Sequence, residues 1–262
     1  MGVQAVTLAN NHIADYGTKG IEDTLKVLND HQIAFTGIEG GNVASEKFIE
    51  WQGLRLALLN FTENEWSTNP KLGLHAAAID PVKNFYAIQQ AKKAADVVLV
   101  FTHSGHEYFS YPTLRTRDWL RFFIEAGADA VINHHPHCIS GFETYQRKPI
   151  FYSVGNFWFD AEKKRNQNWN QGMIAQLIID QELKVKAHAI HFNQGNDKLF
   201  EWCYGSDLTE REEALYELSR VITNNEALKE KFEAWKGIQA KSYKSYIEPM
   251  NVRLIKALQV RG

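Results

Sequence analysis

Imidazole and carboxamide side chains follow three short apolar runs that read as β-strands. The residues at these strand ends are Asn11, His103, His135 and His137. Ligand-binding residues in α/β sheets gather outside the carboxyl ends of strands, so we expect these four side chains to lie together. Imidazole nitrogens and a carboxamide oxygen suit Zn, Mn or Fe, and the pattern therefore predicts a divalent-metal site. No cysteine accompanies the cluster, which argues against a structural Cys/His zinc site.

A single histidine at a strand end is more often structural or exposed than a metal ligand. The pair His135-Pro136-His137 would also be weak evidence alone, because such pairs arise by chance in loops. The combination is more specific, since an Asn-His pair, an isolated histidine and an HxH pair each follow an apolar run. We therefore favour the metal site over scattered histidines.

Strands alternate with helices along the first part of the chain. Apolar runs predict strands at 5–8, 33–36, 54–60, 97–102, 130–133 and 150–153. Amphipathic segments predict helices at 18–31, 81–95 and 113–126. This alternation indicates a layered α/β domain. The runs 173–179 and 185–191 instead predict an antiparallel hairpin, so a mixed sheet or two packed sheets is expected.

The character of the chain changes near residue 206. Thr209 and Glu212 have the spacing of a capping box, and a helical apolar stripe follows them. Asn224-Asn225 interrupts this stripe before a second charged helix. We therefore expect a domain at 1–205 and a helical appendage at 206–262.

The bulk composition excludes several classes of protein. A chain of 262 residues with 44% hydrophobic residues can bury a substantial core. A formal charge of −2 gives no electrostatic reason to expect a nucleic-acid partner. Two cysteines, Cys138 and Cys203, cannot build a disulfide framework. No apolar run is long enough to predict a transmembrane segment, and the first residues do not read as a signal peptide.

Four segments, in order along the chain, resemble the CapA family of bacterial capsule (poly-γ-glutamate) synthesis proteins. They are LANNHIADYG at 8–17, HSGHEY at 103–108, AGADAVINHHPH at 126–137 and YSVGNF at 152–157. The third segment departs from the family pattern, because Asn133 stands where the family usually has glycine.

This family is similar to the calcineurin-like metallophosphoesterases, whose fold is a four-layer α/β/β/α sandwich with mixed sheets. The resemblance implies two divalent metal ions (Mn, Fe or Zn) at the sheet edge. Asn11, His103 and His135 would bind one ion and His137 the other, while His12 would be the catalytic histidine that assists the transition state or leaving group.

Three further residues occupy matched positions without an assigned role in the chemistry. Glu107, Tyr108 and Asn156 are expected to contact substrate, and a purely scaffolding role in their loops is the alternative.

The resemblance also implies that an N-terminal part of the site is absent. Family members carry a preceding Gly-Asp strand and an acidic segment, which should supply the carboxylates that bind and bridge the metals. This chain begins just before the run 5–8, so we expect a fold that lacks the N-terminal strand region. A truncated sequence, an inactive relative and a separate completing polypeptide are the three explanations. We favour truncation, because a missing core strand would expose a sheet edge.

The resulting hypothesis is a capsule-synthesis protein whose intact form hydrolyses a phosphoester by metal-activated hydroxide. The substrate would be a phosphoester or a molecule related to the capsule polymer. One alternative is a non-catalytic accessory subunit of a capsule-polymer synthesis or export complex. Another is a polymer-binding module that uses Trp158 and nearby aromatic residues. Family members are often anchored at or exported to the cell surface, so the location of this chain stays open.

Overall fold

A computed structural model of the chain describes residues 2–41, 43–159, 169–195 and 200–240. Its centre is a mixed sheet in which β5, β7, β8 and β10 run parallel and the two edge strands run antiparallel to their neighbours. Within the described residues, the strand order is β4 (Glu46–Trp51), β5 (Leu54–Thr62), β7 (Val97–His103), β8 (Ala130–His134), β10 (Lys148–Phe151) and β9 (Phe142–Tyr145).

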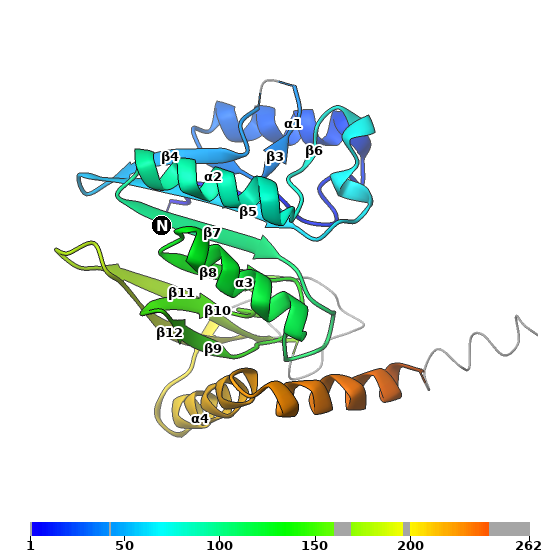
Figure 1. The fold of residues 1–262 in the computed structure, drawn as a ribbon, viewed down its shortest axis with the longest axis vertical. Coiled ribbons are helices and arrows are strands. Elements are labelled where there is room, and N and C mark those ends of the chain that lie inside the picture. The colour runs from blue at the N-terminus through cyan, green and yellow to red at the C-terminus, as the bar shows by residue number, and fades with distance from the viewer. Residues whose placement is uncertain (1, 42, 160–168, 196–199, 241–262) are drawn as a thin grey trace, which may run out of the picture.

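Two helices, α2 (Pro81–Ala94) and α3 (Leu114–Ala126), cover one face of this sheet (Figure 1). The Asp80 side chain accepts hydrogen bonds from the first turn of α2, and Pro81 occupies the first helical position, as the sequence predicts. Apolar side chains of both helices pack on those of the parallel strands and form the larger core cluster. Burial of this cluster is what holds the helices on the sheet.

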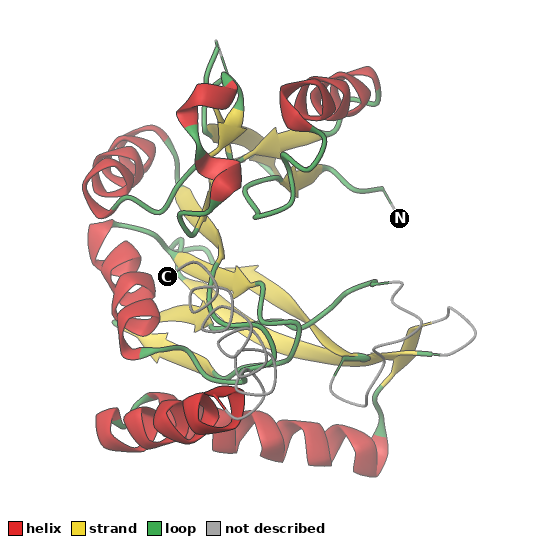
Figure 2. Ribbon diagram, turned by 90° about the vertical axis from the view of Figure 1, so that its right-hand side faces the viewer, coloured by secondary structure: helices red, strands yellow, loops and turns green. Residues whose placement is uncertain are grey.

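A smaller antiparallel sheet covers the opposite face (Figure 2). It consists of β11 (Gln171–Ile179), β12 (Val185–Gln194) and β13 (Phe200–Trp202). A second core cluster fills the space between the sheets, to which Met173 and Val185 contribute from the smaller sheet and Leu99 and Ile132 from the larger. The described chain is therefore layered as helices, sheet and sheet, and the predicted α/β fold with mixed sheets is confirmed.

The N-terminal segments form a separate small cluster at one end of the large sheet. Strands β1 (Ala5–Thr7) and β2 (Ala34–Thr36) pair in parallel, and helix α1 (Gly17–Asp30) connects them. Ile21 and Leu25 of α1 are buried in this cluster with Leu8. The remaining short elements near it are β3 (Ile38–Glu39), η1 (Trp66–Thr68), η2 (Pro70–Leu72) and β6 (His75–Ala76).

The strands and helices predicted before residue 205 are all present, with ends that differ from the expected ones by at most three residues. The edge strands β4 and β9 were not predicted. They carry more charged and partly exposed side chains than the central strands do, so their apolar signal is weak.

The start of the C-terminal helical region differs from the prediction. Helix α4 (Gly205–Ile222) begins four residues before Thr209, so the predicted capping box of Thr209 and Glu212 is wrong. The Thr209 hydroxyl instead donates to the carbonyl of Gly205 within the helix. The boundary proposed at residue 206 stays a prediction.

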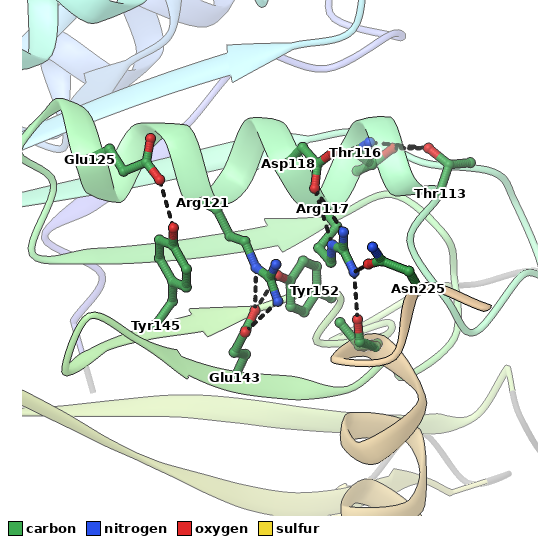
Figure 3. A network of polar contacts seen from close by, with 11 residues as sticks. Thr113, Thr116, Arg117, Asp118, Arg121, Glu125, Glu143, Tyr145, Tyr152 and Asn225 are labelled. Carbon is green, nitrogen blue, oxygen red and sulfur yellow. Dashed lines mark hydrogen bonds and ion pairs between the residues drawn. The ribbon is translucent and has the colours of Figure 1, made fainter. Parts of the chain in front are cut away.

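Helix α4 is tied to the core by a buried arginine (Figure 3). The Nη1 atom of Arg117 on α3 donates to the Ile222 carbonyl at the end of α4, at 3.1 Å, and to Asn225 Oδ1 at 2.7 Å. Asn225 begins a further helical run at 225–240. In the part of the chain that the structure describes, no helix is both long and apolar enough to cross a membrane.

Candidate metal centre

Three of the predicted ligands meet beyond the carboxyl ends of β7 and β8. The Nε2 atom of His103 lies 3.0 Å from Asn11 Oδ1 and 2.9 Å from His135 Nδ1. These atoms come from the loop after β1, the end of β7 and the loop after β8. The fold therefore gathers a carboxamide oxygen and two imidazole nitrogens at one point, as the sequence predicts.

The loop that carries Asn11 is held in place by a buried asparagine of β5. Asn60 Oδ1 accepts a hydrogen bond from the Ala9 amide at 2.6 Å, and its Nδ2 donates to the Phe101 carbonyl of β7. Gly37 lies against the same point, because a Cβ there would come within 2.3 Å of Asn60 Oδ1 and 2.6 Å of Ala9 N. Asn60 thus fixes the distance between the Asn11 loop and the main sheet.

Asn133 holds the strand end that leads to His135. Its Oδ1 accepts from the hydroxyls of Thr102 and Ser104, and its Nδ2 donates to the carbonyls of Ser104 and Tyr152. The Asn133 side chain is 1% exposed, and each of its two polar atoms makes two hydrogen bonds. The residue that departs from the family pattern is therefore a fully bonded buried scaffold, which is a stable arrangement.

Three residues at or beside the centre have a strained backbone. His135, His137 and Tyr108 have φ angles of 120°, 58° and 62°, in the region that disfavours side chains other than glycine. Such conformations cost of order 1–3 kcal/mol each and persist where surrounding structure enforces them. Their occurrence here indicates that the loops are shaped for the position of their side chains.

His137 does not join the other three residues. Its Nδ1 lies 2.8 Å from Asn156 Oδ1, and its ring stacks on Trp169 at 4.8 Å. The rings of His135 and His137 are 6.0 Å apart, so the HxH pair divides its imidazoles between two places. Asn156 is 7% exposed, and its side chain also donates a hydrogen bond to the Trp169 carbonyl, so it fixes the position of the His137 ring. The predicted contact of Asn156 with substrate stays a prediction.

Burial keeps the central imidazoles neutral. It lowers the pKa of His103 to about 2 and that of His135 to about 4, and neighbouring imidazoles contribute to both shifts. The Glu107 carboxylate opposes part of the shift at His135. Neutral imidazoles expose nitrogen lone pairs at pH 7, which is the form that binds a metal ion.

The donor set meets part of what a divalent ion requires. No group of three His, Cys, Asp or Glu side chains within the described ranges is arranged to bind an ion. The centre therefore consists of two imidazoles and one carboxamide. A neutral nitrogen of His103 that lies within 3.0 Å of both the Asn11 oxygen and the His135 nitrogen fits a divalent ion, although without a carboxylate to balance its charge.

A cleft of about 690 Å³ opens beside these residues. Asn11 and His135 line it together with the predicted contacts Glu107 and Tyr108. Its volume lies within the usual range for ligand sites. The imidazole of His12 is largely exposed, and its Nδ1 lies 3.0 Å from the Asp15 carboxylate.

The cleft also contains residues that the sequence analysis missed. Glu63, directly after β5, lines it and accepts a hydrogen bond from the Gly105 amide at 3.2 Å; burial raises the pKa of this carboxyl group. Its place after an apolar strand was the available signal. Trp235 and Lys236 line the cleft from the helical run 225–240, and no local pattern indicates that this run returns to the site.

The fold and this centre define a layered α/β protein with a histidine-rich site at the carboxyl edge of its main sheet. The family model described as "Bacterial capsule synthesis protein PGA_cap" matches residues 1–161, which include Asn11, His103, His135 and His137. The chain belongs to this bacterial capsule synthesis family.

Curated relatives agree with that assignment. The chain is 35% identical over 188 residues to "Capsule biosynthesis protein CapA" of Bacillus anthracis, which covers 68% of this chain and 44% of that protein. It is 34% identical over 183 residues to "PGA biosynthesis protein CapA" of Bacillus subtilis (strain 168), with coverage of 68% and 47%. The chain thus spans about half the length of these relatives. Among solved structures, a hypothetical protein from Thermus thermophilus superposes with a TM-score of 0.48 and 15% identity, over 72% of this chain and 77% of that chain.

Proposed function

We propose that this capsule-synthesis protein acts as a metal-dependent phosphoesterase. The observation that carries the proposal is that His103 Nε2 lies within 3.0 Å of both Asn11 Oδ1 and His135 Nδ1 at the strand ends. Desolvated neutral imidazoles beside a carboxamide oxygen, in a cleft open to a ligand, are suited to a divalent ion.

In this proposal, Asn11, His103 and His135 hold one ion (Mn, Fe or Zn), and His137 contributes to a second. When bound, the metal would supply a Lewis acid that polarises a phosphoryl oxygen. The His137 ring is already fixed by Asn156 and Trp169, so it would enter such a site with little loss of side-chain freedom.

His12 is the proposed catalytic residue. Its Nδ1 faces Asp15, which favours the tautomer with the proton on Nδ1 and leaves Nε2 to exchange a proton with substrate. His12 directly follows Asn11, whose side chain belongs to the centre. With a proton on each ring nitrogen, His12 could give its Nε2 proton to the leaving oxygen of a phosphoester and return to the neutral form with the proton on Nδ1.

Substrate contacts are assigned to Glu107 and Tyr108, which line the cleft. Three carboxylates, those of Glu63, Glu65 and Glu107, and one ammonium group, that of Lys236, also border it. A phosphoryl group would be repelled by this surface unless cations neutralise it, so bound metal is expected to be required for substrate affinity.

The test combines metal analysis with turnover. The protein is loaded with Mn, Fe or Zn, its metal content is measured, and hydrolysis of p-nitrophenyl phosphate and bis-p-nitrophenyl phosphate is followed. The variant His12→Ala should keep its metal and lose about 10²–10⁴-fold in turnover, the usual contribution of a general acid or base. His31→Ala, which changes an exposed histidine at the end of α1, is the matched control. Absence of both metal binding and cleavage would refute the proposal.

A non-catalytic accessory role in a capsule-polymer synthesis complex is the second candidate. Its support is the donor set, which contains two imidazoles and a carboxamide but no third acidic, cysteine or histidine ligand among the described residues. Capsule production in cells that carry His12→Ala separates the two roles. Unchanged production at a normal protein level would favour the accessory role, whereas loss of polymer would favour catalysis.

A further inference from the structure

A second cavity lies beneath helix α4, away from the histidine cleft. It has a volume of about 300 Å³ and shares no lining residue with the cleft. Residues of α4 form one wall, while β11, β12 and the loop after His137 supply the others. A volume of this size is at the lower end of the range for small-molecule sites.

His191 of β12 borders this cavity with a buried imidazole ring. The residue is 3% exposed, and neither ring nitrogen has a partner among the described residues. Burial is the main cause that lowers the pKa of His191, and repulsion from the Arg211 guanidinium lowers it further. The ring is therefore neutral, with one hydrogen-bond donor and one acceptor. Leaving such buried groups unpaired costs free energy. Neither nitrogen has accessible surface, so the ring forms part of the cavity wall and does not itself contact a ligand.

Arg211 of α4 supplies positive charge at the same cavity. Its Nη2 donates to Asn193 Oδ1 at 2.9 Å, and its Nε lies 3.7 Å from the Asp207 carboxylate. These contacts involve two of the three guanidinium nitrogens. Only 16% of the Arg211 side chain is exposed. A guanidinium group that is partly desolvated and retains a donor beyond these contacts is well suited to an anionic oxygen.

The nearby acidic groups leave this donor available. Glu217 also borders the cavity, but its carboxylate pairs with Arg220 at 2.8 Å and is 59% exposed. The Asp207 and Glu212 carboxylates oppose the pKa shift of His191 by attraction, and neither borders the cavity. Among the described residues, Arg211 is therefore the cation that borders the cavity, and the Glu217 carboxylate is engaged by Arg220.

The other side of the cavity is apolar. Ile139, Leu215 and Leu218 line it. We propose that this cavity is a second binding site, which takes a small organic anion whose carboxylate or phosphate meets Arg211 and whose apolar body packs on these three side chains.

The proposed site adjoins the histidine loop but does not depend on the proposed phosphoesterase activity. Cys138, which borders the cavity, directly follows His137 in the chain, and its thiol accepts a hydrogen bond from Ser110 at 3.5 Å. Neither Arg211 nor His191 belongs to the histidine cleft. The site can therefore be tested on protein from which metal has been removed.

The experiment measures binding of benzoate, hexanoate and phenyl phosphate to the metal-free full chain by calorimetry and ligand-observed NMR. Benzamide serves as the uncharged counterpart of benzoate. We expect saturable binding of at least one anion and binding of benzamide that is at least about tenfold weaker, because the guanidinium hydrogen bond is charge-assisted. His103→Ala should bind the anion as well as the wild type does.

Two variants locate the site. Arg211→Met should weaken anion binding by about tenfold or more, while Lys229→Met, which changes an exposed lysine of the helical run 225–240, should not. Ala214→Leu should reduce binding by filling the cavity, without removing any charge. Circular dichroism confirms that each variant is folded. The proposal is overturned if no anion binds, if benzamide binds equally well, or if folded Ala214→Leu binds the anion unchanged.

Discussion

The Nε2 atom of His103 lies 2.9 Å from the Nδ1 atom of His135, although 32 residues separate them in the chain. The pairing of β7 with β8 brings this about, because the register places His103 opposite His134, next to His135. Two neutral nitrogens at this distance share at most one hydrogen bond, and an ion between them would use both lone pairs. This contact is the reason to expect that metal affinity depends on both residues.

Removal of either imidazole should abolish tight metal binding. His103→Ala should lower affinity for Mn or Zn by more than about a hundredfold, since loss of even an outer partner of a ligand costs about 10–100-fold. Metal content after dialysis, measured by mass spectrometry, checks this expectation. His31→Ala should retain the wild-type content, and equal content in both variants would contradict the assignment.

Stability of the metal-free protein should fall as the solution becomes acidic. Burial lowers the pKa of His134 to about 4, below its ordinary value near 6.5. Between these pH values the unfolded chain takes up a proton that the folded chain excludes, so the free energy of unfolding decreases as pH falls from about 6.5 to 4. Urea titrations across this range should show a shallower decline for His134→Gln. Identical slopes would mean that His134 is not protected from protonation.

The buried ion pair between α3 and β9 should be sensitive to loss of its cation (Figure 3). Arg121 donates two hydrogen bonds to Glu143, which also accepts one from the Tyr152 hydroxyl at 2.7 Å. Arg121→Met leaves a carboxylate that is 9% exposed without its partner, and should cost about 3 kcal/mol. Tyr152→Phe keeps the ion pair and should cost about 1.5 kcal/mol. Chemical denaturation measures both, and a larger loss for Tyr152→Phe would reverse the expected ranking.

Docking of α4 should depend on a glycine before β9. A Cβ at Gly141 would lie 2.8 Å from Ser219 N and 2.9 Å from Ser219 Cα, so the backbone of α4 itself would have to move. Gly141→Ala should therefore destabilise the protein by about 1–3 kcal/mol, as overpacking of a core does. Gly237→Ala meets no atom within 4 Å and serves as the control. A Gly141→Ala protein with an unchanged melting temperature would show that α4 can shift without cost.

Much of the fold was predictable because its signals are local. The apolar runs of β5, β7 and β8 and the Asp80-Pro81 start of α2 are visible without knowledge of their partners. Strands β4 and β9 escaped because each is flanked by a better strand and is itself partly exposed. The capping box predicted at Thr209 was wrong because the Thr-x-x-Glu spacing that marks a helix start occurs here inside a helix that already begins at Gly205.

The sequence by itself determined which residues could bind a metal, because imidazole and carboxamide chemistry and their position after apolar strands are properties of the chain. It also predicted that Asn11, His103 and His135 would converge. Only the tertiary structure placed His137 with Asn156, brought Glu63 and Lys236 to the cleft, and left His191 unpaired beneath α4 among the residues described. These relations depend on strand register and helix docking, which arise from contacts between residues far apart in the chain.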